Sequence, residues 1–195
     1  MDNAFSESTA TRAVHDPDAR IAIRPVESAD YAWLRASELS LAMTGRWRLG
    51  GGHPRPEHYA ESLWLGVHSH YVAFDLSRSS GCLGLLSIYD VDWQNGVGYF
   101  AAARFDNSWN GRLGFLFAFQ MALGVTFQTT NLRKLYMDTP SYNHDLIRSF
   151  VRKGLFTEEG RLIERRYLNG QYFDQYILSV TPAQLASLDM IGRAT

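Results

Sequence analysis

A short glycine-containing segment, residues 107–114, combines residue types that bind small anions with a favourable position in the chain. It reads Asn-Ser-Trp-Asn-Gly-Arg-Leu-Gly and stands between an expected strand, residues 97–105, and an expected buried helix that begins at Gly111. The first turn of a helix has backbone N–H groups without acceptors, and the helix dipole adds positive potential there. Glycines let a phosphate approach the backbone, and Arg112 adds a charge. Taken alone, the segment also fits an ordinary helix start.

A second candidate for ligand binding is the segment of residues 44–56, whose glycines and prolines are typical of a mobile loop. It carries two arginines around a tryptophan, Arg46, Trp47 and Arg48. We expect these three residues to line a substrate site, where an arginine pair favours an anionic acceptor or a carboxylate. The alternative is a solvated connector whose Trp47 packs on the core.

The histidines and the single cysteine give no metal site. His68 and His70 alternate at the entrance of a strand and would face the same side, but no carboxylate or third ligand has a matching spacing. Cys82 alone excludes an internal disulfide and a cysteine-cluster zinc site. We therefore expect no bound metal.

The elements that position these segments follow from the hydrophobic pattern. Alternating runs bounded by turn residues predict strands, and apolar residues at the helical spacing or over a long run predict helices. The expected strands are residues 21–26, 71–76, 82–89, 97–105, 132–137, 162–168 and 172–180, and the expected helices are 29–43, 57–65, 111–127 and 143–153. The Asn-Gly pairs at 95–96 and 169–170 predict tight hairpin turns.

This order predicts a single α/β domain with a mixed, mostly antiparallel central sheet and helices on both faces. The strand, helix and strand of residues 97–137 should form a right-handed parallel crossover. We expect the domain to span residues 20–180, after a flexible leader of residues 1–19 and before a C-terminal tail of residues 181–195. Ligands of such sheets bind at the carboxyl ends of strands, which again selects residues 106–114.

Composition limits the class of protein. A chain of 195 residues with 46% hydrophobic and 20% charged residues has an ordinary globular balance. The formal net charge of -1 argues against nucleic acid or an anionic membrane as the partner. The sequence has neither a signal-peptide pattern nor an apolar run of about 18 residues. With one cysteine, these features predict a cytoplasmic protein.

Several segments in order resemble the GNAT superfamily of acetyltransferases, above all the branch that acetylates ribosomal-protein N-termini. The resemblance covers roughly residues 21–180 and is strongest from residue 97 onward. It rests on Gly98-Tyr99-Phe100, on Trp109-Asn110-Gly111-Arg112-Leu113-Gly114, on Leu132-Arg133-Lys134-Leu135, on Asn143, on the Lys153-Gly154 turn with Glu159-Gly160 after it, and on the hairpin Asn169-Gly170-Gln171-Tyr172-Phe173-Asp174.

The resemblance implies binding of an acyl-CoA, with acetyl-CoA the expected donor. It implies that the strand of residues 97–105 carries the pantetheine arm, that the following turn holds the pyrophosphate and that Asn143 contacts the cofactor near the thiol. A helix N-cap is a second role for Asn143, compatible with the first. The implied cofactor-binding residues are Phe100, Ala101, Ala102, Ala103, Asn110, Gly111, Arg112, Leu113, Gly114, Asn143 and Phe150.

The chain departs from the pattern of this family at three positions. Arg112 stands where the family's loop has a glycine, and Gly96 stands where many relatives place a glutamate base. Phe150 replaces the tyrosine that others use as an acid. These departures motivate a second hypothesis, a GNAT-fold CoA-binding or regulatory module without catalysis.

An amine that attacks a thioester must be neutral, so a base has to accept its proton. Asp90, Asp92 and Asp138 stand near the ends of expected central strands, although a surface or turn-capping role is the alternative for each. Tyr142 is a candidate proton donor to the leaving thiolate. The candidate catalytic residues are therefore Asn143, Tyr142, Asp138 and Asp92.

The first hypothesis is accordingly an acetyl-CoA-dependent N-acyltransferase that transfers the acyl group directly in a ternary complex. Its acceptor would be the primary amine of a small molecule or a protein N-terminus, bound by Arg46, Trp47, Arg48 and Trp93. Relatives of this kind often pair through edge strands or the C-terminal hairpin, so a homodimer is compatible with the resemblance.

Overall fold

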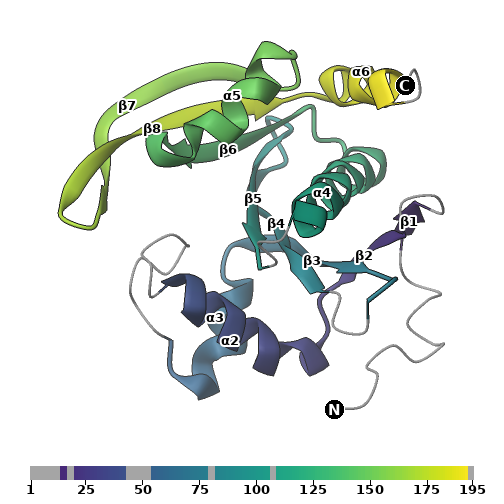
Figure 1. The fold of residues 1–195 in the computed structure, drawn as a ribbon, viewed down its shortest axis with the longest axis vertical. Helices are drawn as coiled ribbons and strands as arrows, with labels where there is room; N and C mark the ends of the chain where they lie inside the picture. Colours follow the sequence, from purple (N-terminus) through teal and green to yellow (C-terminus); the bar gives the residue numbers. More distant parts are fainter. Residues whose placement is uncertain (1–13, 17–19, 43–53, 79–81, 106–108, 193–195) are drawn as a thin grey trace.

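The computed structural model describes residues 14–16, 20–42, 54–78, 82–105 and 109–192. Its centre is one sheet of eight strands in the order β1-β2-β3-β4-β5-β6-β8-β7 (Figure 1). The strands are β1 (Val14–Asp16), β2 (Ile21–Pro25), β3 (Val67–Asp75), β4 (Cys82–Asp92), β5 (Val97–Arg104), β6 (Lys134–Pro140), β7 (Thr157–Leu168) and β8 (Gln171–Val180).

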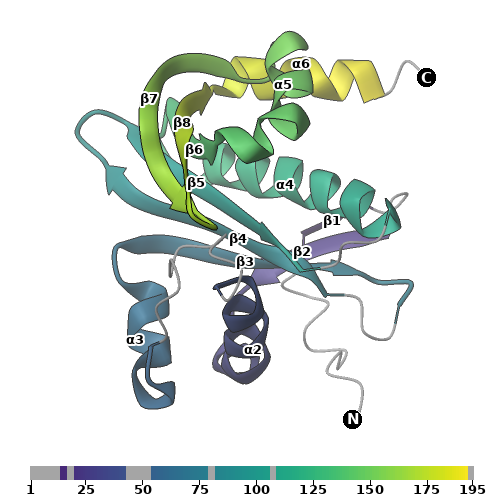
Figure 2. The same cartoon turned by 60° about the vertical axis from the view of Figure 1, so that its left-hand side comes forward.

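Helices cover both faces of the sheet, as expected. Figure 2 shows α2 and α3 on one face and α4 and α5 on the other. The helices are η1 (Ser28–Asp30), α2 (Tyr31–Ala42), η2 (Pro56–His58), α3 (Tyr59–Trp64), α4 (Trp109–Thr129), η3 (Ser141–Asn143), α5 (His144–Arg152) and α6 (Pro182–Gly192). The chain is thus a single α/β domain with a mixed, mostly antiparallel sheet.

The described core has one part on each face of the sheet. On the α4 face, Phe100 is 1% exposed and its ring meets Phe119 of α4 edge-on at 4.7 Å between centroids. On the α2 and α3 face, Leu34, Leu63 and Leu85 are buried in a second cluster. The alternation of side chains along β4 and β5 supplies both clusters from the same two strands.

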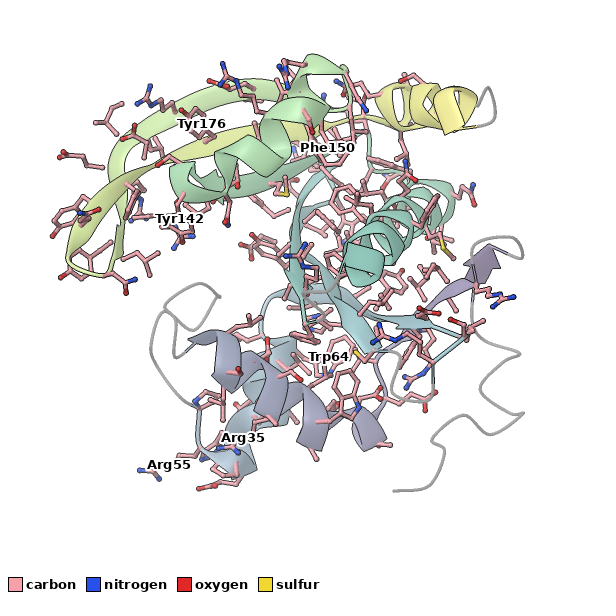
Figure 3. All side chains as sticks on the ribbon, in the orientation of Figure 1. Arg35, Arg55, Trp64, Tyr142, Phe150 and Tyr176 are labelled. Atoms are coloured by element: carbon pink, nitrogen blue, oxygen red, sulfur yellow. The ribbon has the colours of Figure 1, made fainter. Side chains whose placement is uncertain are left out.

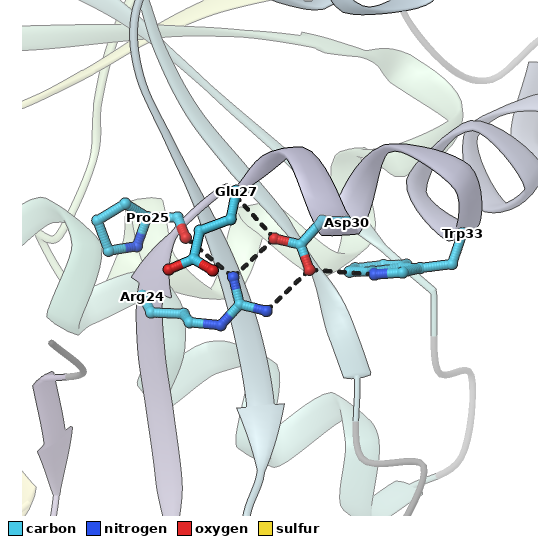
Figure 4. Close-up of polar contacts among 5 residues, drawn as sticks. All are labelled: Arg24, Pro25, Glu27, Asp30 and Trp33. Carbon is cyan, nitrogen blue, oxygen red and sulfur yellow. Dashed lines mark hydrogen bonds and ion pairs between the residues drawn. The ribbon is translucent and has the colours of Figure 1, made fainter. Parts of the chain in front are cut away.

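A buried ion pair joins β2 to the start of α2 (Figure 4). Arg24 Nη1 and Nη2 donate to the two carboxylate oxygens of Asp30 at 2.6 and 2.8 Å. The backbone N–H of Glu27 and the indole N–H of Trp33 donate to the same carboxylate. Burial alone would raise the pKa of Asp30, but these hydrogen bonds outweigh it and hold the pKa below its ordinary value.

Helix α4 begins at Trp109, two residues before the expected start at Gly111. A Cβ atom on Gly114 would lie 2.8 Å from Ile21 Cδ1 and 2.9 Å from Leu83 Cδ1. Gly114 therefore belongs to the second turn, where close packing of helix on sheet explains the absence of a side chain. The sequence had suggested approach of a phosphate as the reason.

The structure adds elements at both ends of the expected domain. Within the expected leader, β1 pairs antiparallel with β2. Within the expected tail, α6 buries Leu185 in the main core. Strand β7 begins at Thr157, five residues before the expected start at Leu162. The sequence did not indicate this earlier start, because the first half of the strand is polar and exposed and lacks apolar alternation.

The two Asn-Gly pairs form different turns. Asn169 and Gly170 both have positive φ, 50° and 82°, in the tight turn expected between β7 and β8. Between β4 and β5, only Gly96 of the second pair has positive φ, 63°. There the connection runs from Trp93 to Gly96, longer than the two-residue turn expected from the sequence.

Candidate functional site

The central strands β5 and β6 run parallel and then separate, which opens the sheet in its middle. They pair only at Val97–Lys134, Gly98–Leu135 and Tyr99–Tyr136. Beyond Tyr99, residues 100–103 keep their pairing with β4 on the other side, but no described strand pairs with them on the side of β6. A ligand that lies extended along β5 on that side can hydrogen-bond to the backbone as an added strand does.

Two helix N-termini follow the separated ends of these strands. Helix α4 begins at Trp109 after β5, and α5 begins at His144 after β6. The first four backbone N–H groups of a helix have no acceptor within it, and helix N-termini of this kind suit an anion. In α4 these groups belong to residues 109–112, within the segment expected to bind the pyrophosphate. The side chains of residues 109–113, including Arg112, lie outside the described part of the structure.

Asp138 lies on β6 at the edge of the opening, two residues beyond the last pair with β5. Burial raises the pKa of its carboxyl, while Arg166 and Arg165 act weakly in the opposite direction. The side-chain amide of Gln175 on β8 donates to Asp138 Oδ2 at 2.8 Å and orients it. A half-buried carboxylate with a raised pKa is a better proton acceptor than an ordinary aspartate.

Three tyrosines form a row across the sheet beside Asp138, one each on β4, β5 and β6. Tyr99 is the register partner of both Tyr89 and Tyr136, so all three side chains lie on the same face. The ring centroids of Tyr89 and Tyr99 are 5.6 Å apart, and those of Tyr99 and Tyr136 are 5.7 Å apart. Burial, with Asp138 next, raises the pKa of Tyr89 to about 12, so its hydroxyl stays protonated.

Asn143 and Tyr142 lie where β6 passes into α5. Asn143 occupies the N-cap position of α5, but its exposed side chain makes no capping hydrogen bond. Its amide is therefore available to a ligand at the carboxyl end of β6. The ring of Tyr142 meets Phe173 of β8 edge-on at 5.2 Å, which fixes it beside the hairpin of β7 and β8 (Figure 3).

Asp92 and Trp93 lie at the other end of β5, away from the opening. Asp92 is opposite Val97, and its carboxylate accepts hydrogen bonds from the backbone N–H and side-chain amide of Asn95. The side-chain bond, the largest cause, lowers the pKa of Asp92. Trp93 is half exposed and packs on His68. The structure does not bring these two residues together with Asp138 and Asn143.

The expected cofactor-binding residues of β5 differ in how much of each side chain is buried. Phe100 is buried against α4, so only its backbone faces the opening. Ala101 and Ala102 are half-buried and Ala103 is buried. Phe150 of α5 packs on Phe156 at 6.3 Å between centroids.

The expected substrate residues Arg46, Trp47 and Arg48 lie outside the described residues.

Sequence reasoning missed Gln175 and the tyrosine row. Gln175 is a buried polar side chain within an expected strand, a pattern that can mark a buried hydrogen bond. Tyr99 belonged to the Gly-Tyr-Phe motif, but its alignment with Tyr89 and Tyr136 depends on the register of β4, β5 and β6. No sequence signal for that register was available.

Two other features of the described residues lie outside the opening. A hollow of about 330 Å³ between α2 and α3 is lined by Tyr31, Ala32, Arg35, Pro56, Tyr59 and Ala60. Figure 3 places Arg35 and Arg55 at this end of the molecule, remote from Tyr142 and Phe150. Within the described ranges, no group of three metal-ligating side chains comes together and no helix is long and apolar enough to cross a membrane.

The opened sheet, with β8 inserted between β6 and β7, has a GNAT-like fold, shared with solved structures of acetyltransferases. No family model and no curated protein sequence matches the chain. The fold assignment therefore comes from solved structures.

Three such structures illustrate the similarity. A chimera based on the spermidine N-acetyltransferase of Vibrio cholerae is 19% identical with a TM-score of 0.70, over 86% of this chain and 98% of that one. The Vibrio cholerae enzyme in complex with CoA and spermine is 17% identical with a TM-score of 0.68, over 86% and 99%. A ribosomal-protein-S5-alanine acetyltransferase from Vibrio fischeri is 17% identical with a TM-score of 0.63, over 87% and 96%. At this identity the similarity establishes the fold alone.

Proposed function

We propose that the protein is an acyl-CoA-dependent N-acyltransferase that uses acetyl-CoA and acts on a primary amine. The observation that carries the proposal is the separation of β5 and β6 after three residue pairs. Residues 100–103 of β5 then have no described strand beside them on the side of β6, and a half-buried carboxylate, Asp138, lies next to this opening. A structural neighbour with the same fold was solved with CoA and spermine, which supports this use of the opening.

The residues at the opening fit an acyl-CoA donor. An extended amide-containing arm would hydrogen-bond to the backbone of residues 100–103 as an added strand does. The backbone N–H groups of residues 109–112 would bind the pyrophosphate at the start of α4. The exposed amide of Asn143 lies at the carboxyl end of β6, where the thioester would be held. When bound, acetyl-CoA supplies a thioester carbon that an amine nitrogen attacks.

Asp138 accepts the proton that the acceptor amine must lose. An ammonium group has no free electron pair, so transfer begins with removal of one proton to the carboxylate, directly or through a water. Gln175 holds the carboxyl in place at 2.8 Å, and burial brings its pKa closer to neutral pH. The C–N bond then forms as the C–S bond breaks, and Tyr142 is the nearby hydroxyl that can protonate the thiolate.

The acceptor is a small-molecule amine or a protein N-terminus. The neighbours described above include enzymes named for a polyamine and for ribosomal protein S5, so the fold accommodates both kinds of acceptor. The motifs of residues 98–100 and 169–174 favour the branch that acetylates ribosomal-protein N-termini. We further propose a cytoplasmic location, and a homodimer remains a prediction.

A CoA-binding module without catalysis is the second candidate. It is supported by Gly96, which offers no carboxylate at the position of the family's usual base, and by Phe150, which has no hydroxyl. Under this reading Asp138 is only a polar partner of Gln175. The two candidates make the same prediction for CoA binding and opposite ones for turnover.

Calorimetric titration with acetyl-CoA and CoA, followed by a thiol-release assay with pooled primary amines, tests the proposal. We expect both nucleotides to bind and free thiol to appear only when an amine is present. Binding without amine-dependent thiol release would favour the module. Absence of binding by acetyl-CoA and by longer acyl-CoAs would overturn both candidates.

A further inference from the structure

The row formed by Tyr89, Tyr99 and Tyr136 crosses the sheet where the opening begins, on the face covered by α2 and α3. Register neighbours share a face, and Leu85 and Ala103 on the same face pack with Leu34 of α2 and Leu63 of α3. All three tyrosines are half-buried, so part of each ring is accessible. The row is therefore an aromatic surface that an acceptor entering from this face would meet.

One end of this row already binds an ammonium group. Lys134 Nζ lies 5.6 Å from the centroid of the Tyr136 ring. Its charge is balanced by Glu159, whose carboxylate accepts a hydrogen bond from Nζ at 2.7 Å. Aromatic faces attract cations at this separation. The rings of Tyr89 and Tyr99 offer the same chemistry along the rest of the row.

The charges around Tyr99 favour a cation in particular. The pKa of Tyr99 is raised, first by burial and then by the charge of Asp138, the phenol of Tyr136 and the charge of Asp90. No basic group is among the causes. Arg166 acts on Tyr89 and, with Arg165, on Asp138. The described charged groups that face the row are therefore Asp90, Asp138, Lys134, Glu159, Arg165 and Arg166. The charged groups that act on Tyr99, at the centre of the row, are the carboxylates Asp138 and Asp90.

We infer that the ring of Tyr99 binds the cationic head of the acceptor, and that the acceptor is an alkylammonium compound without a carboxylate next to its amine. This inference rests on the proposed function, because it assigns the acceptor side of the same opening. The ammonium lies against Tyr99, then loses one proton to Asp138 and becomes the nucleophile. An α-carboxylate at this point would face Asp138 and Asp90 and be repelled.

A pair of unreactive probes tests the binding step without any turnover. Choline carries a quaternary ammonium that cannot be acylated, and 3,3-dimethylbutan-1-ol has the same shape without the charge. We expect the full-length protein, saturated with CoA, to bind choline about 3- to 30-fold more tightly than the neutral alcohol. Equal binding of the two compounds, or binding of neither, would overturn the inference.

Variants of Tyr99 locate the effect. Tyr99→Phe keeps the ring and should keep the preference for choline, whereas Tyr99→Leu should abolish it. Tyr172→Leu, a matched change at an exposed tyrosine of the hairpin, should leave it unchanged. A preference for choline that survives in Tyr99→Leu contradicts the inference. If Tyr99→Leu does not fold, Tyr99→Trp serves instead, because its larger ring surface should strengthen choline binding. Weaker choline binding by Tyr99→Trp would contradict the inference.

The substrate class is tested with phenethylamine and phenylalanine, which differ only in the α-carboxylate. We expect kcat/KM to favour phenethylamine by about tenfold or more, and Tyr99→Leu to raise KM more than it lowers kcat. A preference for phenylalanine would overturn the inference while acetyl-CoA turnover still supported the proposed function. Absence of turnover with any primary amine, together with normal choline binding, would instead reject the proposed function and the acceptor assignment and leave only cation binding by Tyr99.

Discussion

The two parts of the sheet on either side of the opening hold their charges in different ways. Before the opening, Arg24 and Asp30 are 7% and 3% exposed and are paired with each other. Beyond the opening, Arg161 pairs with Asp174 on the surface of the β7–β8 hairpin. In the first pair both side chains are shielded from water, whereas Arg161 of the second pair is half exposed, so a charge without its partner carries the larger penalty in the first pair. The part that includes β2 is therefore the less tolerant support of the site.

The largest effect is expected from breaking the buried pair. Asp30→Asn leaves the guanidinium of Arg24 buried without a counter-charge and should lower the free energy of unfolding by about 3–5 kcal/mol. The pKa of Asp30 is lower in the folded state than in the unfolded state. The stability that the ionised carboxylate contributes is therefore fully present above the unfolded-state pKa and is lost as pH falls through the folded-state pKa. Urea denaturation from pH 3 to 7 measures both. A loss below about 1 kcal/mol would show that the pair is not a main support.

The next effect concerns Asp138, at the boundary between the two parts. Asp138→Asn should lower kcat by about 10²-fold or more, because the amide cannot accept the amine proton. The pKa of Asp138 is raised in the folded state, so the wild-type protein loses stability as pH rises from the ordinary aspartate pKa to this raised pKa. Asp138→Asn has no group to ionise there and should become more stable relative to wild type over the same pH range. Steady-state kinetics and denaturation at several pH values test this. An active variant would remove Asp138 from the mechanism.

A smaller effect distinguishes packing from ligand binding in α4. Gly124→Ala meets no atom within 4 Å and should stabilise the helix by up to about 1 kcal/mol. Gly114→Ala brings a methyl group against the δ-methyls of Ile21 and Leu83, which offsets that gain. We expect Gly114→Ala to be about 1 kcal/mol less stable than Gly124→Ala, with acetyl-CoA affinity unchanged in both. Loss of acetyl-CoA affinity in Gly114→Ala but not in Gly124→Ala would show that Gly114 is needed for cofactor binding.

The smallest effect is expected beyond the opening. Asp174→Asn removes the charge that pairs with the half-exposed Arg161 but keeps an oxygen for the backbone N–H of Glu164. We expect no measurable change in the melting temperature, because water and salt screen a pair of this kind. Differential scanning calorimetry at low and high salt is the measurement. A clear decrease would mean that the two parts of the sheet do not differ as described.

Much of the fold could be predicted because its elements have strong local patterns. The apolar run of residues 111–127 is too long for a strand and indicated a buried helix, which α4 confirms. The parallel pairing of β5 and β6 follows from the strand, helix and strand order and is also confirmed. β1 could not be foreseen, because a three-residue strand has too little pattern to distinguish it from a loose terminus.

The site was less predictable than the fold. Asp92 and Asp138 looked alike in the sequence, since both are aspartates near the end of a strand. Only the structure separates them, with Asp92 bound to Asn95 in a turn and Asp138 half-buried beside the opening. The Arg24–Asp30 pair was missed because its members are six positions apart in the chain and the turn between them decides whether they meet.

The order of the strands has a consequence for unwanted association. An exposed sheet edge can template the strands of other molecules and lead to aggregation. Of the two outer strands, β1 has only three residues. β7 is charged and is interrupted by a bulge at Glu164, whose φ is 51°. Among the described strands, an uncharged stretch without a neighbouring strand therefore lies inside the sheet, along residues 100–103, and not at either outer edge.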